Sequence, residues 1–148
     1  MKNTMKQATK RVFCTLLCGL MLLSLAACSQ EKEVTSELWK NATYTEDTEL
    51  GEGAKTVKVV VEADNQKITF TIHSDAEMLG DALQDNKLVE GEESEYGLYV
   101  KVVNGITADY DTDQAYWAFY QNGEYMNTGV DSTSFADGEQ YELVYTKD

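Results

Sequence analysis

Three carboxylates stand at alternate positions in the segment Asp109-Tyr110-Asp111-Thr112-Asp113. Clustered carboxylate oxygens suit the hard Ca²⁺ ion, and this spacing matches the opening of a calcium-binding loop. The rest of such a loop is missing, because Gln114 stands where the glycine of the sharp turn belongs and Tyr120 where a bidentate acid belongs. The sequence therefore favours the alternative interpretation, a solvated turn between strands.

Cysteine and histidine, the other residues that commonly carry chemistry, are scarce. The chain has three cysteines, Cys14, Cys18 and Cys28, and one histidine, His73. A metal site built on two histidines is excluded, and a Ser–His–Asp triad is conceivable only through His73. Because no nucleophile or orienting acid is tied to His73 by its spacing, we do not expect an enzyme.

The N-terminus has the pattern of an export signal. Four basic residues precede an uncharged apolar stretch over residues 12–27, which is shorter than the roughly 20 residues of a membrane-spanning helix. The stretch ends in Leu25-Ala26-Ala27-Cys28, which resembles the lipobox of bacterial lipoproteins. That resemblance implies that residues 1–27 are removed as a signal peptide and that Cys28 receives a diacylglyceryl thioether. An uncleaved anchor and ordinary signal cleavage are the alternatives.

Charge narrows the possible partners. The chain has 12 Lys and Arg against 26 Asp and Glu, and four of the basic residues but none of the acidic ones lie in residues 1–27. Residues 28–148 thus carry eight basic and 26 acidic side chains, a net charge of −18. Such a surface repels phosphate, so we expect no nucleic-acid partner and no electrostatic docking on anionic lipid.

Residues 28–54 and residues 55–148 differ in composition. The first segment, which begins at the lipidated Cys28, is polar and acidic and is expected to be a flexible tether. Trp39 and Tyr44 interrupt it, so its second half has the alternative of packing on the domain as an extra strand. Residues 55–148 are long enough for one hydrophobic core, and we expect one domain there.

The apolar period within residues 55–148 is mostly two, which predicts strands. One hairpin is expected over residues 57–72, with a turn at residues 63–66. Later strands are expected at residues 98–103, 115–120 and 141–145, with Asn-Gly turns at 104–105 and 122–123.

One segment has a helical period instead. Ser74-Asp75-Ala76-Glu77 has the form of a capping box, and apolar residues at helical spacing follow it as far as Leu83. Gly80 inside this helix suggests close packing against the sheet. Residues 90–95 are expected to be an acidic loop. The order predicts an α+β fold, a β-grasp-like mixed sheet of about five strands with one packing helix.

Six motifs then follow one another in a fixed order along the C-terminal half: Tyr96-Gly97-Leu98-Tyr99-Val100, Val103-Asn104-Gly105-Ile106, Ala115-Tyr116-Trp117, Asn122-Gly123-Glu124, Thr128-Gly129-Val130-Asp131-Ser132 and Asp137-Gly138-Glu139. The set resembles the C-terminal domain of transcobalamin and intrinsic factor. It is more similar still to the transcobalamin C-terminal-like domains of bacterial lipoproteins, whose function is largely unknown. The resemblance spans about residues 55–147 and implies a soluble ligand-binding β-grasp domain, which in the vertebrate carriers closes over one face of cobalamin.

The resemblance also implies which residues contact the ligand. The segment Thr128, Gly129, Val130, Asp131 and Ser132 matches the family segment whose backbone and small side chains approach the corrin ring. Small residues there would let main-chain groups come close to a flat ligand.

Aromatic residues are the second part of the expected site. Tyr99 stands where the carriers have an aromatic residue facing the ligand. Trp117 matches a family tryptophan, but its alternation with Phe119 favours a place in the core. The many tyrosines of the strand half suit a flat-ligand or protein-binding surface, and ordinary strand composition explains them equally well.

The expected function is therefore non-enzymatic. We expect a lipid-anchored protein on the extracytoplasmic face of the cell envelope that captures cobalamin or another corrinoid for uptake, with no resident cofactor or metal. The carriers enclose cobalamin with a helical barrel that has no counterpart in this sequence, so a transporter or a second binding protein is an expected partner. The alternative is an adhesion or assembly module that binds an envelope protein or polysaccharide and no small ligand.

Overall fold

The two longest strands, β2 (Lys55–Ala63) and β3 (Gln66–Ser74), form an antiparallel hairpin in the computed structural model, which describes residues 36–148. Asp64 and Asn65 in its turn have φ angles of 48° and 63°, the left-handed geometry that Asp and Asn tolerate best. Buried residues alternate along both strands, as the apolar period predicts: Val57, Val59, Val61, Ile68, Phe70 and Ile72.

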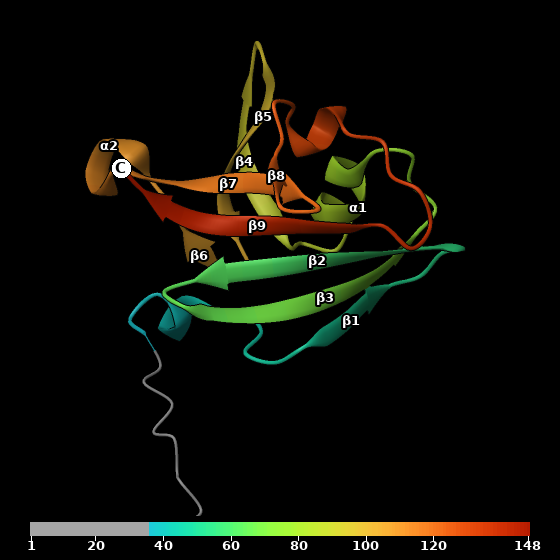
Figure 1. The fold of residues 1–148 in the computed structure, drawn as a ribbon, viewed down its shortest axis with the longest axis horizontal. Helices are drawn as coiled ribbons and strands as arrows, with labels where there is room; N and C mark the ends of the chain where they lie inside the picture. Colours follow the sequence, from blue (N-terminus) through green and yellow to red (C-terminus); the bar gives the residue numbers. More distant parts are fainter. Residues whose placement is uncertain (1–35) are drawn as a thin grey trace, which may run out of the picture. The chain divides into compact units, whose positions relative to one another are not determined.

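This hairpin lies within a mixed six-stranded sheet with the order β1-β3-β2-β9-β7-β8 (Figure 1). The short β1 (Thr48–Gly51) runs parallel to β3, and β9 (Gln140–Lys147) runs parallel to β2. β7 (Ala115–Gln121) pairs antiparallel with β9, and the two-residue β8 (Glu124–Tyr125) covers only the last part of the outer edge of β7.

A smaller sheet and a helix lie on one side of the large sheet (Figure 1). The three strands are β4 (Val89–Ser94), β5 (Gly97–Val103) and β6 (Ile106–Thr107), and the helix is α1 (Leu79–Asp85). Their buried side chains join those of the large sheet in one hydrophobic cluster. The α+β class is thus confirmed, but the described residues contain nine strands in two sheets where the sequence predicted about five in one.

The predicted helix start at Ser74 is wrong. β3 continues through Ser74, whose Oγ accepts a hydrogen bond of 3.0 Å from the main-chain N–H of Ala76. α1 begins two residues after the end of the predicted box, at Leu79, without a side-chain cap. The capping-box pattern failed because Ser74 pairs with Lys55 of β2, and the ladder extends the strand through the position where a cap was expected.

The acidic segment 90–95 is also not a loop. Residues 89–94 form β4, which pairs antiparallel with β5, and the β4–β5 hairpin projects from the rest of the fold (Figure 1). Only Val89 of this strand is buried. An exposed strand has no apolar alternation to reveal it, which explains the difference.

The packed unit begins before residue 55. Trp39, in the short 3₁₀ helix η1 (Trp39–Asn41), is buried, and its Nε1 donates a 2.8 Å hydrogen bond to the carbonyl of Ala63. Residues 48–51 add the parallel edge strand β1. Within the segment 28–54, the part from residue 36 onward therefore packs on the domain, as Trp39 and Tyr44 suggested.

The export and lipidation predictions concern another part of the chain. The predicted signal peptide over residues 1–27 and the predicted lipidation site Cys28 lie outside the described residues. Among residues 36–148, no helix has the length and apolar character needed to cross a membrane.

Candidate ligand-binding site

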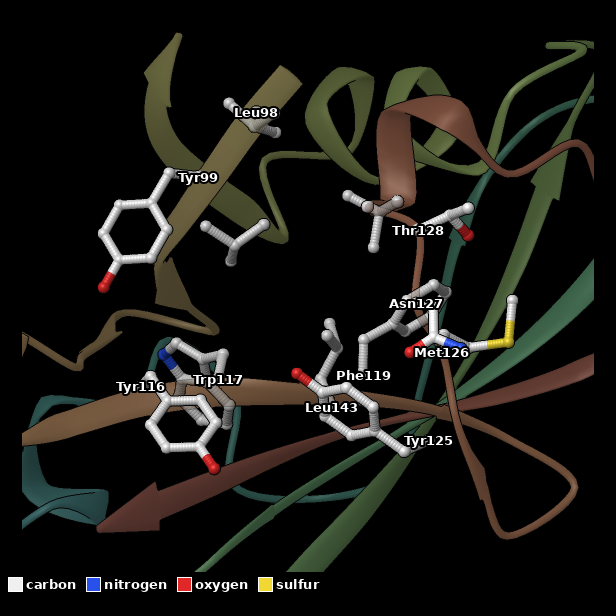
Figure 2. Close-up of a pocket in the computed structure, with 13 residues that line it drawn as sticks. Leu98, Tyr99, Tyr116, Trp117, Phe119, Tyr125, Met126, Asn127, Thr128 and Leu143 are labelled. Atoms are coloured by element: carbon white, nitrogen blue, oxygen red, sulfur yellow. The ribbon is translucent and has the colours of Figure 1, made fainter. Parts of the chain in front are cut away.

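A groove of about 350 Å³ opens between β5, the outer edge of β7 and the segment that follows β8 (Figure 2). Its volume falls within the range of small-molecule pockets, roughly 300–1,000 Å³. The lining contains no charged side chain: it consists of Leu98, Tyr99, Val100, Tyr116, Trp117, Phe119, Tyr125, Met126, Asn127, Thr128, Gly129, Val130 and Leu143.

The lining is divided into an apolar floor and a tyrosine rim. The floor consists of buried side chains from four elements: Leu98, Trp117, Phe119, Val130 and Leu143. At the rim, Tyr99 is 40% and Tyr125 58% exposed, and Tyr116 is half-buried. A flat ligand with polar edges fits this division, because its faces can rest on the floor while the phenol groups at the rim form hydrogen bonds.

Tyr116 at the rim stays neutral at physiological pH. Burial, with a smaller contribution from the nearby Asp148 carboxylate, raises the pKa of Tyr116 above its usual value of 10.0. Its phenol group therefore keeps its proton and remains available as a hydrogen-bond donor.

A short helix forms the wall of the groove opposite β7. After β8 the chain runs through residues 126–129 into η2 (Val130–Ser132), and the carboxylate of Asp131 accepts a 3.0 Å hydrogen bond from the main-chain N–H of Leu98. Gly97, at φ +100°, makes this approach possible, since a Cβ there would lie 2.3 Å from Oδ2 of Asp131. The contact holds the wall against the start of β5.

Four of the six predicted contact residues line the groove: Tyr99, Thr128, Gly129 and Val130. Asp131 and Ser132 do not line it. The carboxylate of Asp131 is directed to β5 instead, and Ser132 is exposed at the end of η2. Whether the four lining residues contact a ligand stays a prediction.

The sequence placed Trp117 in the core, indicated Tyr125 only as one of the tyrosines of the strand half, and did not indicate Met126 as a site residue. Trp117 is buried, with 7% exposure, and its ring packs edge-on against Tyr145 at a centroid distance of 5.6 Å. It nevertheless lines the groove, because β8 ends before it covers this part of β7. No sequence pattern marks how far a partner strand extends.

The segment 109–113, whose carboxylates resemble the opening of a calcium loop, has a structural role instead. Asp109 caps α2 (Tyr110–Asp113), where its Oδ1 accepts hydrogen bonds from the main-chain N–H groups of Asp111 and Thr112 at 2.8 and 3.2 Å. Within residues 36–148, no group of three or more His, Cys, Asp or Glu side chains is arranged to hold a metal ion.

His73 lies between two polar partners on neighbouring strands. Its Nδ1 is 3.1 Å from Oγ1 of Thr56, and its Nε2 is 2.5 Å from Oε1 of Glu49, which is on β1. Sequence spacing did not reveal either partner. Because Glu49 is on the edge strand, the pair attaches β1 to β3.

The fold and the groove define an α+β domain with an uncharged groove that is partly lined by aromatic side chains. Residues 76–147 match the model of DUF4430, a domain of unknown function. The crystal structure of a "putative metal binding protein" from Ruminococcus gnavus ATCC 29149 is 36% identical, with a TM-score of 0.61, and the match covers 64% of this chain and 99% of that one. The chain belongs to the same family as the Ruminococcus gnavus protein.

A second solved structure shares the fold. Haptocorrin in complex with Cbi is 21% identical, with a TM-score of 0.51, over 63% of this chain. The match spans 25% of the length of haptocorrin. No curated protein matches the sequence.

Proposed function

We propose that this protein is a lipoprotein, anchored through Cys28 on the extracytoplasmic face of the envelope, whose domain binds a corrinoid-sized flat ligand without catalysing a reaction. It would pass the ligand to a membrane transporter or to a second binding protein. The observation that carries the proposal is the open, uncharged groove with its apolar floor and tyrosine rim.

The shape of the groove supports capture of one part of the ligand. A cavity of about 350 Å³ takes up an edge or one face of a corrinoid and leaves the remainder in solvent. Haptocorrin, which shares the fold and is in complex with Cbi, is about four times as long as the segment that matches this chain. A partner that covers the exposed part of the ligand is therefore part of the proposal.

The polarity of the groove supports a neutral or weakly polar ligand. The lining has no lysine or arginine to hold an anion, and the chain as a whole has a net charge of −14. Small anions are consequently disfavoured as ligands.

The test is a titration of residues 29–148 with cyanocobalamin and with cobinamide, followed by calorimetry. Saturable binding with a Kd below about 10 μM, or about −7 kcal/mol, supports the proposal. Tyr99→Ala should weaken binding, whereas Tyr96→Ala is the matched control, because Tyr96 is 87% exposed on the same hairpin and does not line the groove. An absence of binding to both corrinoids would favour the protein-binding alternative.

A further inference from the structure

The indole N–H of Trp117 is the one buried side-chain polar group among the groove-lining residues that forms no hydrogen bond within the described residues. Its nitrogen is fully buried and forms no hydrogen bond, and the residue is 7% exposed. Buried donors in native proteins are almost always paired, because an unpaired one loses its hydrogen bond to water without compensation. An unpaired donor inside a groove therefore indicates an acceptor supplied from outside the chain.

Trp39, the other tryptophan, shows that an unpaired indole N–H is specific to Trp117. Nε1 of Trp39 is also buried, and it donates a 2.8 Å hydrogen bond to the carbonyl of Ala63. Figure 2 shows the Trp117 nitrogen on the side of its ring that is nearer Tyr99, the rim residue on β5. The two indoles thus form a natural pair for comparison: the N–H of Trp39 has a partner within the core, whereas the N–H of Trp117, a residue that lines the groove, has none among the described residues.

The main chain of Trp117 adds two more groups. The carbonyl of Phe119 accepts a 2.9 Å hydrogen bond from the N–H of Met126, which places the Phe119 carbonyl on the side of β7 away from β9. Main-chain groups alternate sides along a strand, so the N–H and carbonyl of Trp117 face the same way. β8 pairs with β7 only at Tyr120 and Gln121, and no main-chain bond of residues 36–148 reaches Trp117 from that side.

These groups together define the chemistry of a ligand. Trp117, which lines the groove, thus has two N–H donors and one carbonyl acceptor without a partner in residues 36–148, and the lining contains no cation that would favour a carboxylate or phosphate. A neutral amide carries both an acceptor oxygen and N–H donors, which matches this set. An anionic oxygen would satisfy the donors but would be repelled by a chain with a net charge of −14.

We propose that Trp117 anchors the ligand, its indole N–H donating a hydrogen bond to the oxygen of a neutral amide group bound at the free edge of β7. The inference rests on the proposed function and specifies which ligand group the groove selects. Amides of this kind occur both as the side arms of cobinamide and in peptides, and the experiment separates these two sources.

The experiment follows the two indole N–H signals by NMR in the full chain, held in detergent, during titration with three probes. Cobinamide carries amide arms, cobyrinic acid carries carboxylates in their place, and N-acetyl-trialanine amide is an uncharged peptide. Cobinamide should move the Trp117 signal and leave the Trp39 signal unchanged. Cobyrinic acid should bind at least about tenfold more weakly, as expected from the loss of one hydrogen bond.

Two variants provide the matched comparison. Trp117→Phe removes the unpaired donor, keeps an aromatic ring, and should weaken cobinamide binding about tenfold. Trp39→Phe should leave binding unchanged but lower the unfolding midpoint more, because it leaves the Ala63 carbonyl without its partner. Thermal unfolding of both variants checks that each is folded at the titration temperature.

Each outcome decides a different claim. If cobinamide binds while the Trp117 signal stays in place and Trp117→Phe binds equally well, the inference is overturned and the proposed function stands. If only the peptide binds, with the Trp117 signal responding, the inference stands and the corrinoid is ruled out as ligand. If no probe binds at about 1 mM, both claims fail.

Discussion

Asp131 and Leu98 join two elements that are far apart in the sequence: Oδ2 of Asp131 accepts a 3.0 Å hydrogen bond from the main-chain N–H of Leu98. Through this contact η2 is held against the first residues of β5, and the groove lies beside the junction. The other carboxylate oxygen, Oδ1, is buried without a partner in the described part of the chain. Asp131, which the sequence predicted as a ligand contact, thus positions the wall of the groove.

Replacing this carboxylate should loosen the wall. Asp131→Ala leaves the Leu98 N–H without its acceptor, and we expect a loss of about 1–2 kcal/mol in the free energy of unfolding. Ligand binding should weaken as well, because η2 is then free to move relative to β5. Urea denaturation gives the first quantity and calorimetric titration with cobinamide the second.

Asp131→Asn is the control for this prediction. The amide oxygen can still accept from Leu98, so this variant should lose less than half as much stability as Asp131→Ala. Equal losses in the two variants would mean that the negative charge, rather than the hydrogen bond to β5, accounts for the effect.

Gly80 on α1 gives a prediction in which two effects have opposite signs. Helix propensity alone favours Gly80→Ala by about 1 kcal/mol. A Cβ at this position, however, would lie 2.7 Å from Cα and 2.9 Å from N of Asp131, both main-chain atoms. Because main-chain atoms cannot move aside cheaply, we expect Gly80→Ala to destabilise the protein by about 1–3 kcal/mol in urea denaturation.

Gln84→Ala tests the same helix without the contact. Gln84 is exposed on α1, and its replacement should change stability by no more than about 0.5 kcal/mol. A gain in stability for Gly80→Ala would show that α1 and η2 are farther apart than the structure has them. The sequence correctly signalled close packing at Gly80, but the partner is η2 and not the sheet.

The parts of the fold that the sequence predicted correctly are those that neighbouring residues determine. The period of two in β2 and β3 marks their buried faces, and the Asn-Gly turns at 104–105 and 122–123 adopt positive φ angles as expected. These signals are local, because alternation and turn geometry require only a few consecutive residues.

The remaining features depend on contacts between distant segments. β4 is acidic and exposed, and it is a strand only because β5 pairs with it. Trp117 alternates with Phe119 as a core residue would, and it reaches the groove only because β8 stops after two residues. No local sequence pattern predicts how far a partner strand extends or where η2 lies.

Asn104 gives a stability prediction at the N-terminal segment. It is buried, and its side chain accepts a 2.9 Å hydrogen bond from the N–H of Tyr44 and donates a 2.8 Å hydrogen bond to the carbonyl of Tyr44. Asn104→Gly keeps the left-handed turn conformation and removes both bonds. We expect a loss of about 1–3 kcal/mol in urea denaturation, because the main-chain groups of Tyr44 lose their partners.

Asn122→Gly is the matched control for Asn104. Both asparagines occupy the same position of an Asn-Gly turn, with φ angles of 52° and 51°, but Asn122 is exposed and holds no other segment. Its replacement should be nearly neutral. A similar loss in both variants would assign the effect to the turn conformation rather than to the bonds with Tyr44.

The pair Tyr141 and Glu139 predicts how stability depends on pH. The phenol of Tyr141 donates a 2.6 Å hydrogen bond to Oε2 of Glu139, which also accepts from the N–H of Ala136. These two bonds, the phenol first, lower the pKa of Glu139 below its usual 4.5, and burial keeps the pKa of Tyr141 well above 10.0. Because the folded-state pKa of Glu139 is depressed, its contribution to stability is present above pH 4.5 and is lost as the pH falls through that lower pKa.

Tyr141→Phe should therefore cost stability in a pH-dependent way. At pH 7 we expect the variant to be less stable than the natural chain by about 1 kcal/mol, and near pH 3 the difference should shrink, because protonation of Glu139 weakens the bond that the variant lacks. Urea denaturation at several pH values measures this difference. Tyr145→Phe on the same strand is the control, because the Tyr145 hydroxyl forms no hydrogen bond among the described residues, and its effect should be the same at both pH values. A Tyr141→Phe deficit that stays constant from pH 7 to pH 3 would show that the phenol contributes packing alone, independently of the charge on Glu139.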